Sequence, residues 1–297
     1  MNPTQNILIL GASGFIGYPL YEILKDKKDI HLKVLLRKPD KRFDKKHVLI
    51  GDIKTFDWNH LPFEPDVVYH LARINASRFQ RIGRWIAAQK GRRANLKLKK
   101  YLSHLPNACK LIYVAGSLSY GNSNFPITEK SPLSPISFAK EYILAEDVWF
   151  QKSVGNLSTQ IVRIPWVLGD GSWFRTFYVQ PILKEKKIPQ YGKGDNVMTL
   201  IDVFDVVKCL VNINSNDSIL HITGPVVVTQ KEWLDYLKQQ LQLPIREVPL
   251  SNYETAIQEA FTSSIDFKSQ YNYFDKTIES TTISQLLDKY LYLFKNI

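Results

Sequence analysis

The sequence NILILGASGFIG occupies residues 6–17. Its first five residues are mostly apolar and predict a buried strand, and glycines follow at positions 11, 14 and 17. Residues 18–24 then have the character of a helix. In such a loop one glycine permits the tight turn, one lets the backbone approach a pyrophosphate, and one lets the helix pack closely on the strand. The order of strand, glycine loop and helix therefore predicts a dinucleotide site, with the phosphates at the N-terminus of the helix.

Six further apolar segments follow, and most are separated by stretches long enough for a helix. They are residues 32–36, 48–50, 67–71, 111–115, 160–164 and 219–222. This alternation predicts an α/β fold, a Rossmann-type doubly wound parallel sheet with helices on both faces. We expect residues 1–165 to form an NAD(P)-binding domain, which the strand near 218–222 rejoins.

The remaining chain is less regular. After residue 165 it becomes rich in turns and aromatic residues, with helical segments at 230–241 and 283–294. We expect residues 166–297 to form mostly a smaller C-terminal lobe that binds the substrate.

The residues after the second strand indicate which dinucleotide binds. A carboxylate there would hold the ribose hydroxyls of NAD, but this chain has Arg37 and Lys38. Two cations suit the 2′-phosphate, so we expect NADP(H) rather than NAD(H). Ordinary surface charges would give the same pattern, and this alternative stays open. Asp52, after the third strand, is a candidate acceptor for the adenine amine.

Composition excludes several classes of protein. A hydrophobic fraction of 44% with 23% charged residues over 297 residues is typical of a globular chain, not of a disordered, collagenous or coiled-coil one. Cys109 and Cys209 lie far apart without a CxxC motif, so we expect neither a disulfide framework nor a metal site. No apolar stretch approaches the roughly 20 residues of a membrane span, and no signal peptide is recognisable. We therefore expect a cytoplasmic protein.

The formal charge of +11 is concentrated in one region. Residues 78–100 contain no acidic residue and the following basic ones: Arg78, Arg81, Arg84, Lys90, Arg92, Arg93, Lys97, Lys99 and Lys100. Phe79, Ile82 and Ile86 recur at helical spacing and could bury one side of a helix whose charges stay solvated. The alternative is a docking surface for an acidic protein, such as a phosphate-bearing carrier, or for an anionic lipid surface. Nucleic acid ranks last because no nucleic-acid-binding motif accompanies the charge.

Eight segments, in collinear order, resemble the extended short-chain dehydrogenase/reductase family, the group of nucleotide-sugar epimerases and dehydratases. They are the glycine loop, residues 51–53, 66–72, 113–121, 162–165 with Gly169, 191–194, 201–205 and 221–225. The resemblance implies an NAD(P)-binding lobe, a C-terminal lobe that closes over a small-molecule substrate, and a homodimer. Since one helix of the usual dimer interface is the basic one, a monomer or a hetero-complex stays open. The cofactor site that we predict comprises Gly11, Ser13, Gly14, Phe15, Ile16, Gly17, Arg37, Lys38, Asp52, Ile53, Leu71, Ala72 and Pro165.

The catalytic residues of that family are missing here. Its members use a serine or threonine, a tyrosine, and a lysine four residues after the tyrosine. In this chain the corresponding positions hold Gly116, Phe138 and Tyr142. Phenylalanine has no proton to transfer, and a neutral tyrosine supplies no fixed charge, so the usual mechanism is excluded. The one YxxxK sequence, residues 21–25, lies on the first helix and is interpreted as structural.

Three hypotheses follow, and whether the chain is an enzyme stays open. The first is an NADP-dependent reductase or isomerase with a relocated acid, for which the candidates are Tyr142, Ser117, Lys140 and Tyr120. The second is a non-catalytic, nucleotide-stabilised structural or regulatory subunit that binds an acidic partner through residues 78–100. The third is a redox-neutral reaction on the same fold, with NADP(H) bound permanently or not at all.

The candidate substrate residues argue against a nucleotide sugar. Met198 stands where nucleotide-sugar members have an arginine that grips the diphosphate, and a methionine offers no phosphate donor. An aromatic segment, residues 166–178, is expected to line a site for an apolar or carrier-bound substrate, with core packing as the alternative. The substrate residues that we predict are Trp166, Trp173, Phe174, Arg175 and Met198.

Overall fold

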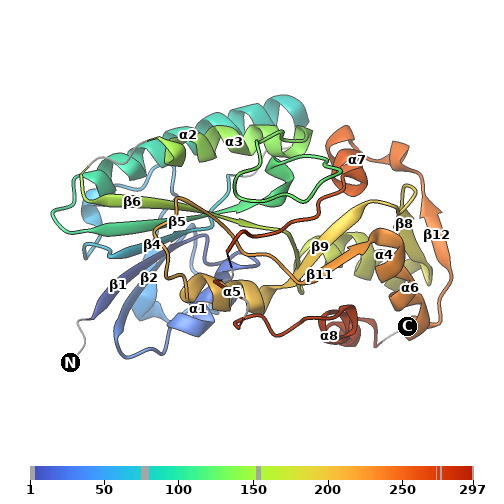
Figure 1. Cartoon of the computed structure of the whole chain (residues 1–297). Coiled ribbons are helices and arrows are strands. Elements are labelled where there is room, and N and C mark those ends of the chain that lie inside the picture. Colours follow the sequence, from blue (N-terminus) through green and yellow to red (C-terminus); the bar gives the residue numbers. More distant parts are fainter. Residues whose placement is uncertain (1–3, 75–79, 152–154, 272, 275, 296–297) are drawn as a thin grey trace. The chain divides into compact units, whose positions relative to one another are not determined.

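The computed structural model describes residues 4–74, 80–151, 155–271, 273–274 and 276–295 (Figure 1). The chain divides into two compact units. The first comprises Met1–Ala115, Glu141–Val162 and Ser215–Leu220, and the second comprises Gly116–Lys140, Arg163–Asn214 and His221–Ile297.

A seven-stranded sheet forms the centre of the first unit, and its strands are the seven expected from the sequence. They are β1 (Gln5–Leu10), β2 (Ile30–Leu36), β3 (Val48–Ile50), β4 (Val67–His70), β5 (Cys109–Gly116), β6 (Leu157–Ile164) and β10 (Ile219–His221). The order across the sheet is β10-β6-β5-β4-β1-β2-β3. The neighbouring pairs β5-β4, β4-β1, β1-β2 and β2-β3 are parallel. The doubly wound Rossmann architecture is confirmed.

Burial explains why these segments form strands. Ile7, Leu8, Ile9 and Leu10 are all at most 2% exposed. A continuous apolar run of this kind is typical of a parallel strand that is covered on both faces. In Figure 1 helices α2 (Gln80–Ser103) and α3 (Ser137–Phe150) cover one face of the sheet, and α1 (Gly17–Leu24) covers the other. Short 3-10 turns, Lys45–His47 and Trp58–His60, complete the connections.

Helix α2 contains most of the basic segment, and its charges do not all face solvent. Lys99 is 8% exposed, and its ammonium group donates to the carbonyls of Val148 and Gln151, both at 2.9 Å. This cation therefore satisfies carbonyls at the C-terminus of α3. Arg78 and Phe79 lie outside the described residues.

The expected burial of Ile86 is wrong, because this side chain is 40% exposed. The buried side of α2 carries small residues in its first half, namely Gly83, Ala87, Ala88, Gly91 and Ala94, and then Asn95, Leu98, Lys99 and Leu102. A Cβ at Gly91 would come within 3.2 Å of the Ala145 Cβ on α3. The two helices thus pack closely. Close packing requires small residues on the buried side of α2, and Ile86 lies outside that side.

The second unit contains a three-stranded sheet in the order β11-β9-β7 and a two-stranded sheet formed by β12 and β8. Its strands are β7 (Trp166–Leu168), β8 (Ile188–Tyr191), β9 (Val197–Asp202), β11 (Val226–Thr229) and β12 (Ile245–Val248). Its helices are α4 (Gln180–Glu185), α5 (Val203–Val211), α6 (Gln230–Leu241), α7 (Thr255–Thr262) and α8 (Ile283–Asp288), with short turns at Ser117–Ser119, Arg175–Val179, Leu250–Asn252 and Leu291–Phe294. An aromatic core, which includes Phe174, Tyr178, Tyr191 and Trp233, holds these elements together.

Each unit is made of three separate segments of the chain, so the sequence alternates between the two units. Residues 116–140 belong to the second unit. Glu259 accepts hydrogen bonds from the backbone amide and hydroxyl of Ser137, and Ile127 donates to the carbonyl of Asp266. These partners lie more than a hundred residues away in the sequence, so no local pattern could have revealed them.

The helix expected over residues 283–294 is shorter than predicted. Helix α8 ends at Asp288, and a separate 3-10 turn covers Leu291–Phe294. Between them the Tyr290 hydroxyl donates to the buried carboxylate of Asp202 at 2.7 Å.

In the described part of the chain no helix is long and apolar enough to cross a membrane.

Candidate functional site

The glycine loop lies where the strand order reverses. β1 and β4 are neighbours in the sheet, and ligands of such folds bind at the carboxyl ends of the strands beside this point. Gly11 follows β1 with a φ of +88°, and a Cβ there would lie 2.6 Å from the Ala72 nitrogen. Leu71 and Ala72 follow β4, so the loops after the two strands are in direct contact.

Each glycine in the loop has a different surrounding. A Cβ at Gly17 would lie 2.2 Å from the Gly11 carbonyl oxygen, which no side chain could tolerate without movement of the backbone. Among the described residues, a Cβ at Gly14 would meet that same oxygen alone, at 3.1 Å, and Gly14 and Ser13 are exposed. The outer side of the loop is therefore open. A pyrophosphate fits this cradle, which any larger residue at Gly14 would narrow.

The N-terminus of α1 is suited to a phosphate. The N-cap residue Ile16 makes no side-chain hydrogen bond to the helix, and the first turn contains no acidic residue. The backbone amides and the positive end of the helix dipole are thus not neutralised by a carboxylate of the helix itself. Phe15 and Ile16, which belong to the predicted cofactor site, lie in this segment.

Arg42 is a site residue that the sequence analysis missed. Its Nη2 donates to the Ser13 carbonyl in the glycine loop at 3.3 Å and to the Asp40 carboxylate at 2.7 Å. Its guanidinium carbon also lies 4.8 Å from the ring centre of Tyr18. Hydrogen bonds from Arg42 lower the pKa of Asp40. The arginine is therefore held beside the glycine loop.

Arg37 and Lys38 follow β2 and are exposed. Together with Lys41 and Arg42 they place four cations in the six-residue segment 37–42 after the second strand. The Asp40 carboxylate two residues before Arg42 is the sequence signal that could have identified Arg42 as the cation held beside the loop. Asp52, in contrast, accepts from the Lys54 amide at 2.9 Å and forms an ion pair with the Lys54 ammonium at 3.0 Å.

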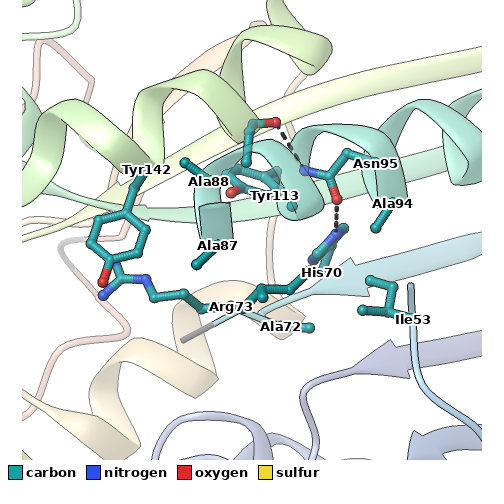
Figure 2. Close-up of a pocket in the computed structure, with 13 residues that line it drawn as sticks. Ile53, His70, Ala72, Arg73, Ala87, Ala88, Ala94, Asn95, Tyr113 and Tyr142 are labelled. Atoms are coloured by element: carbon teal, nitrogen blue, oxygen red, sulfur yellow. Dashed lines mark hydrogen bonds between the residues drawn. The ribbon is translucent and has the colours of Figure 1, made fainter. Parts of the chain in front are cut away.

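A small cavity adjoins the loop after β4 (Figure 2). Its volume is about 30 Å³, enough for about one water molecule. The lining includes two residues of the predicted cofactor site, Ile53 and Ala72, together with His70, Arg73, Asn95 and Tyr142.

His70 is the most buried polar group at this cavity, with 1% exposure. Its Nε2 lies 2.9 Å from the Asn95 Oδ1, and the Asn95 amide donates to the Ala145 carbonyl at 2.9 Å. Since an amide oxygen only accepts, Nε2 carries the proton, and Nδ1 has no hydrogen-bond partner among the described residues. Burial lowers the pKa of His70 to about 4, so the ring is neutral near pH 7.

Arg73 and Tyr142 form a stacked pair at the other end of the same cavity. The guanidinium carbon of Arg73 lies 3.6 Å from the centre of the Tyr142 ring, and Figure 2 shows the two groups against each other. Tyr142 comes from α3, and Arg73 comes from the loop after β4. A positive charge therefore lies beside the residue that occupies the position of the family lysine. Sequence analysis identified Tyr142 but missed Arg73, which directly follows the predicted cofactor residues Leu71 and Ala72.

The other three acid candidates belong to the second unit. The Tyr120 hydroxyl, 4% exposed, lies 2.7 Å from the His221 Nε2, while His221 Nδ1 donates to the Lys268 carbonyl at 2.7 Å. Nε2 is thus the acceptor, and the Tyr120 proton is already engaged. Ser117 is 3% exposed, and Lys140 is exposed on the first turn of α3.

Gly116 and Phe138 occupy two of the positions where the family has catalytic residues. Gly116 has a φ of −98°, and a Cβ there would meet no atom of the described residues within 4 Å. Phe138 lies within α3. Tyr21, of the YxxxK sequence, is 1% exposed and hydrogen-bonds to His47 and the Asp44 amide, consistent with a structural role.

The predicted substrate residues fall into two groups. Phe174 and Met198 are fully buried in the core of the second unit, and for Phe174 this burial agrees with the core-packing alternative. Trp166 and Trp173 are partly buried, with ring centres 4.9 Å apart, and Arg175 forms an ion pair with Asp170. Pro165, of the predicted cofactor set, is buried in the same unit.

Comparison with known proteins agrees with this architecture. The model of the NAD dependent epimerase/dehydratase family matches residues 7–222. No curated protein matches the sequence.

Solved structures resemble the whole chain at low sequence identity. The human epimerase family protein SDR39U1 (isoform 2), solved with NADPH, is 17% identical with a TM-score of 0.79, covering 96% of this chain and 98% of its own. MoeE5, solved with UDP-glucuronic acid and NAD, is 18% identical with a TM-score of 0.77 and coverages of 98% and 99%. TunA, an NAD-dependent NDP-hexosamine 5,6-dehydratase, is 20% identical with a TM-score of 0.75 and coverages of 99% and 98%.

Proposed function

Because the chain belongs to the NAD-dependent epimerase/dehydratase family, we propose that it binds NADP(H) and acts as a reductase or isomerase on a small molecule other than a nucleotide sugar. The observation that carries this proposal is the glycine loop, whose outer side is open and whose Ser13 carbonyl is held by Arg42. The solved relatives contain NAD or NADPH, which supports a nicotinamide cofactor here.

The preference for the phosphorylated cofactor rests on charge. Arg37, Lys38 and Arg42 lie within six residues after β2, at the end of the strand where the adenosine ribose of a dinucleotide binds in this fold. Arg42 is pre-positioned by Asp40, so less conformational entropy is lost when it receives a phosphate. A guanidinium favours a 2′-phosphate over a neutral hydroxyl.

Replacement of Arg42 by alanine should weaken NADPH binding by about ten- to hundredfold, since a hydrogen bond to a charged group contributes about 1.5–3 kcal/mol. NADH binding should change by less than about threefold, because NADH lacks the phosphate. Isothermal titration of both cofactors measures the effect. Lys41→Ala, which removes an exposed neighbouring cation, is the matched control. An equal loss for both cofactors would assign Arg42 to loop structure and not to cofactor choice.

The absence of a phosphate donor at position 198 supports a substrate other than a nucleotide sugar. Met198 lies on β9 and is completely buried in the aromatic core, so this position presents no cation to a diphosphate. The partly buried Trp166 and Trp173 favour an apolar or aromatic substrate.

The chemistry divides between cofactor and chain. A bound nicotinamide would supply or accept a hydride. The chain must then give a proton to the substrate oxygen, or remove one from it. We assign this proton to the Tyr142 hydroxyl, since the Tyr120 proton is engaged by His221. The Arg73 guanidinium, stacked on the Tyr142 ring, would stabilise negative charge that develops on the phenol oxygen during transfer.

Tyr142→Phe is expected to lower NADPH-dependent reduction by at least about tenfold, because positioned acid catalysis contributes about 10²–10⁴-fold. Arg73→Met should lower it as well, by a smaller factor. Both are measured as NADPH oxidation with a panel of aldehydes and ketones, after a carbonyl compound that the wild type reduces has been found. Tyr292→Phe, at a tyrosine with 49% exposure, is the control.

Two results would reject this assignment in different ways. Unchanged turnover of Tyr142→Phe would exclude Tyr142 as the acid. If NADPH raises the melting temperature but no carbonyl compound is reduced, the nucleotide-stabilised structural or regulatory subunit becomes the better interpretation. The function of the chain would then be sought in the binding of an acidic protein to residues 78–100.

A further inference from the structure

Four exposed cations form a straight line along helix α2. Lys90, Arg93, Lys97 and Lys100 follow one another at intervals of three and four residues, and all four are exposed. At 100° per residue they lie within about 80° of one another around the helix, and at 1.5 Å per residue they span about 15 Å. We call these four residues the α2 cation stripe.

The charge of the stripe is not neutralised by the chain itself. Helix α2 contains no aspartate or glutamate. Within the part of the chain that the structure describes, none of the four side chains forms an ion pair or a hydrogen bond. Lys99, on the opposite side of the helix, does find partners, in the Val148 and Gln151 carbonyls. Lys99 is therefore a structural cation of α2, whereas the four cations of the stripe are available to another molecule.

Apolar side chains continue the same surface toward the N-terminus of α2. Ile86 lies four residues before Lys90, hence on the line of the stripe, and is 40% exposed. Trp85 flanks it and is 60% exposed. A tryptophan in water next to a row of cations needs an explanation, since an isolated large aromatic side chain gains free energy when it is buried.

The composition of this surface distinguishes between kinds of partner. Three of the four stripe cations are lysines, and lysine is depleted in the cores of protein interfaces, where arginine and aromatic residues are enriched. Lysine and arginine together with an exposed tryptophan are instead typical of helices that lie on anionic membranes. A second copy of this chain is a poorer partner, because α2 packed on α2 would oppose like charges.

We propose that the α2 cation stripe, with Trp85 and Ile86, binds the anionic headgroups of a lipid surface, so that the protein is a peripheral membrane protein. The cations would bind lipid phosphates, and Trp85 would enter the boundary between headgroups and acyl chains. The proposal is independent of the cofactor and the reaction, since every residue involved lies on the exposed side of α2.

The test is co-sedimentation with phosphatidylcholine vesicles prepared with or without phosphatidylglycerol, at low and at physiological ionic strength. The wild type should sediment with the anionic vesicles alone, and less so as salt is added. The triple variant Lys90→Glu/Arg93→Glu/Lys97→Glu should bind at least about tenfold more weakly, since each cation near an anionic surface contributes to the attraction. Trp85→Ala should weaken binding by about threefold or more.

A control separates the stripe from net charge. Lys27→Glu/Lys28→Glu/Lys45→Glu changes three other exposed lysines of the same unit by the same charge and should retain binding within about twofold. Should the triple glutamate variant fail to fold, as circular dichroism would reveal, Lys90→Gln/Arg93→Gln/Lys97→Gln replaces it.

Three results would overturn the proposal. The first is wild-type protein that does not bind anionic vesicles, and the second is a control variant whose vesicle binding falls as much as that of the stripe variant. The third is a stripe variant that still binds vesicles but no longer binds an acidic helical peptide, or no longer self-associates in light scattering. The last would assign the stripe to a protein partner.

Discussion

Replacing Gly17 by alanine is expected to lower the free energy of unfolding by about 3 kcal/mol and to weaken NADPH binding by more than about a hundredfold. The new Cβ would lie 2.2 Å from the Gly11 carbonyl oxygen and 2.8 Å from the Ala12 Cα, both backbone atoms that no side-chain rotation can move. Overpacking of this kind costs about 1–3 kcal/mol, and here the strain would fall on the loop that receives the phosphates. Urea unfolding and isothermal titration with NADPH measure the two effects.

Gly116→Ala is the matched control for the stability measurement. Its Cβ would meet no described atom within 4 Å, and its φ of −98° is open to any residue. We expect unchanged stability, or a gain of up to about 1 kcal/mol because alanine restricts the unfolded chain. If Gly17→Ala were as stable as the control and bound NADPH normally, the close contact of α1 with the β1 loop would be wrong.

Acidification from pH 7 to pH 5 is expected to remove about 4 kcal/mol of stability through two buried histidines. Desolvation lowers the pKa of His70 to about 4 and that of His221 to about 4, from the usual 6.5. In this window the unfolded chain binds these two protons and the folded protein does not, so stability falls as the pH falls. One pKa unit corresponds to about 1.4 kcal/mol, which gives about 2 kcal/mol for each ring at pH 5.

Urea unfolding at a series of pH values between 7 and 5 tests this expectation. His70→Gln and His221→Gln should each remove about half of the pH dependence. His60→Asn and His104→Asn, at exposed positions, should leave it intact. A stability that is flat across the window would mean that both rings are protonated in the folded protein or that both are accessible to water.

The sheet was predictable because its strands are short, continuous apolar runs. All seven were recognised from the sequence, and their ends differ from the predicted ones by three residues at most. The glycine spacing located the first of them, and a parallel sheet buried on both faces leaves little ambiguity about the rest. The buried side of α2 was harder to predict. Ile86 has the spacing of a core position, yet its side chain is exposed, and alanines of α2 are buried instead.

The site was predictable where it depends on neighbours in sequence and not where distant segments meet. The glycine loop and the cations after β2 were recognised, but the contact of Arg42 with Ser13 depends on how the chain turns back toward the loop. Arg73 and Tyr142 are separated by 69 positions, and only the fold of the first unit brings Tyr142 of α3 against Arg73 in the loop after β4. The burial of Phe174 and Met198 likewise depends on an aromatic core assembled from the whole second unit.

The open space beside Gly116 bears on how this position can be redesigned. A side chain at this position would displace no described neighbour, and the backbone there has a conformation that every amino acid adopts. Packing among the described residues therefore leaves room for a serine or threonine hydroxyl at this position. A designer who wishes to install the hydroxyl that the family uses can begin here, because the new Cβ displaces no described neighbour.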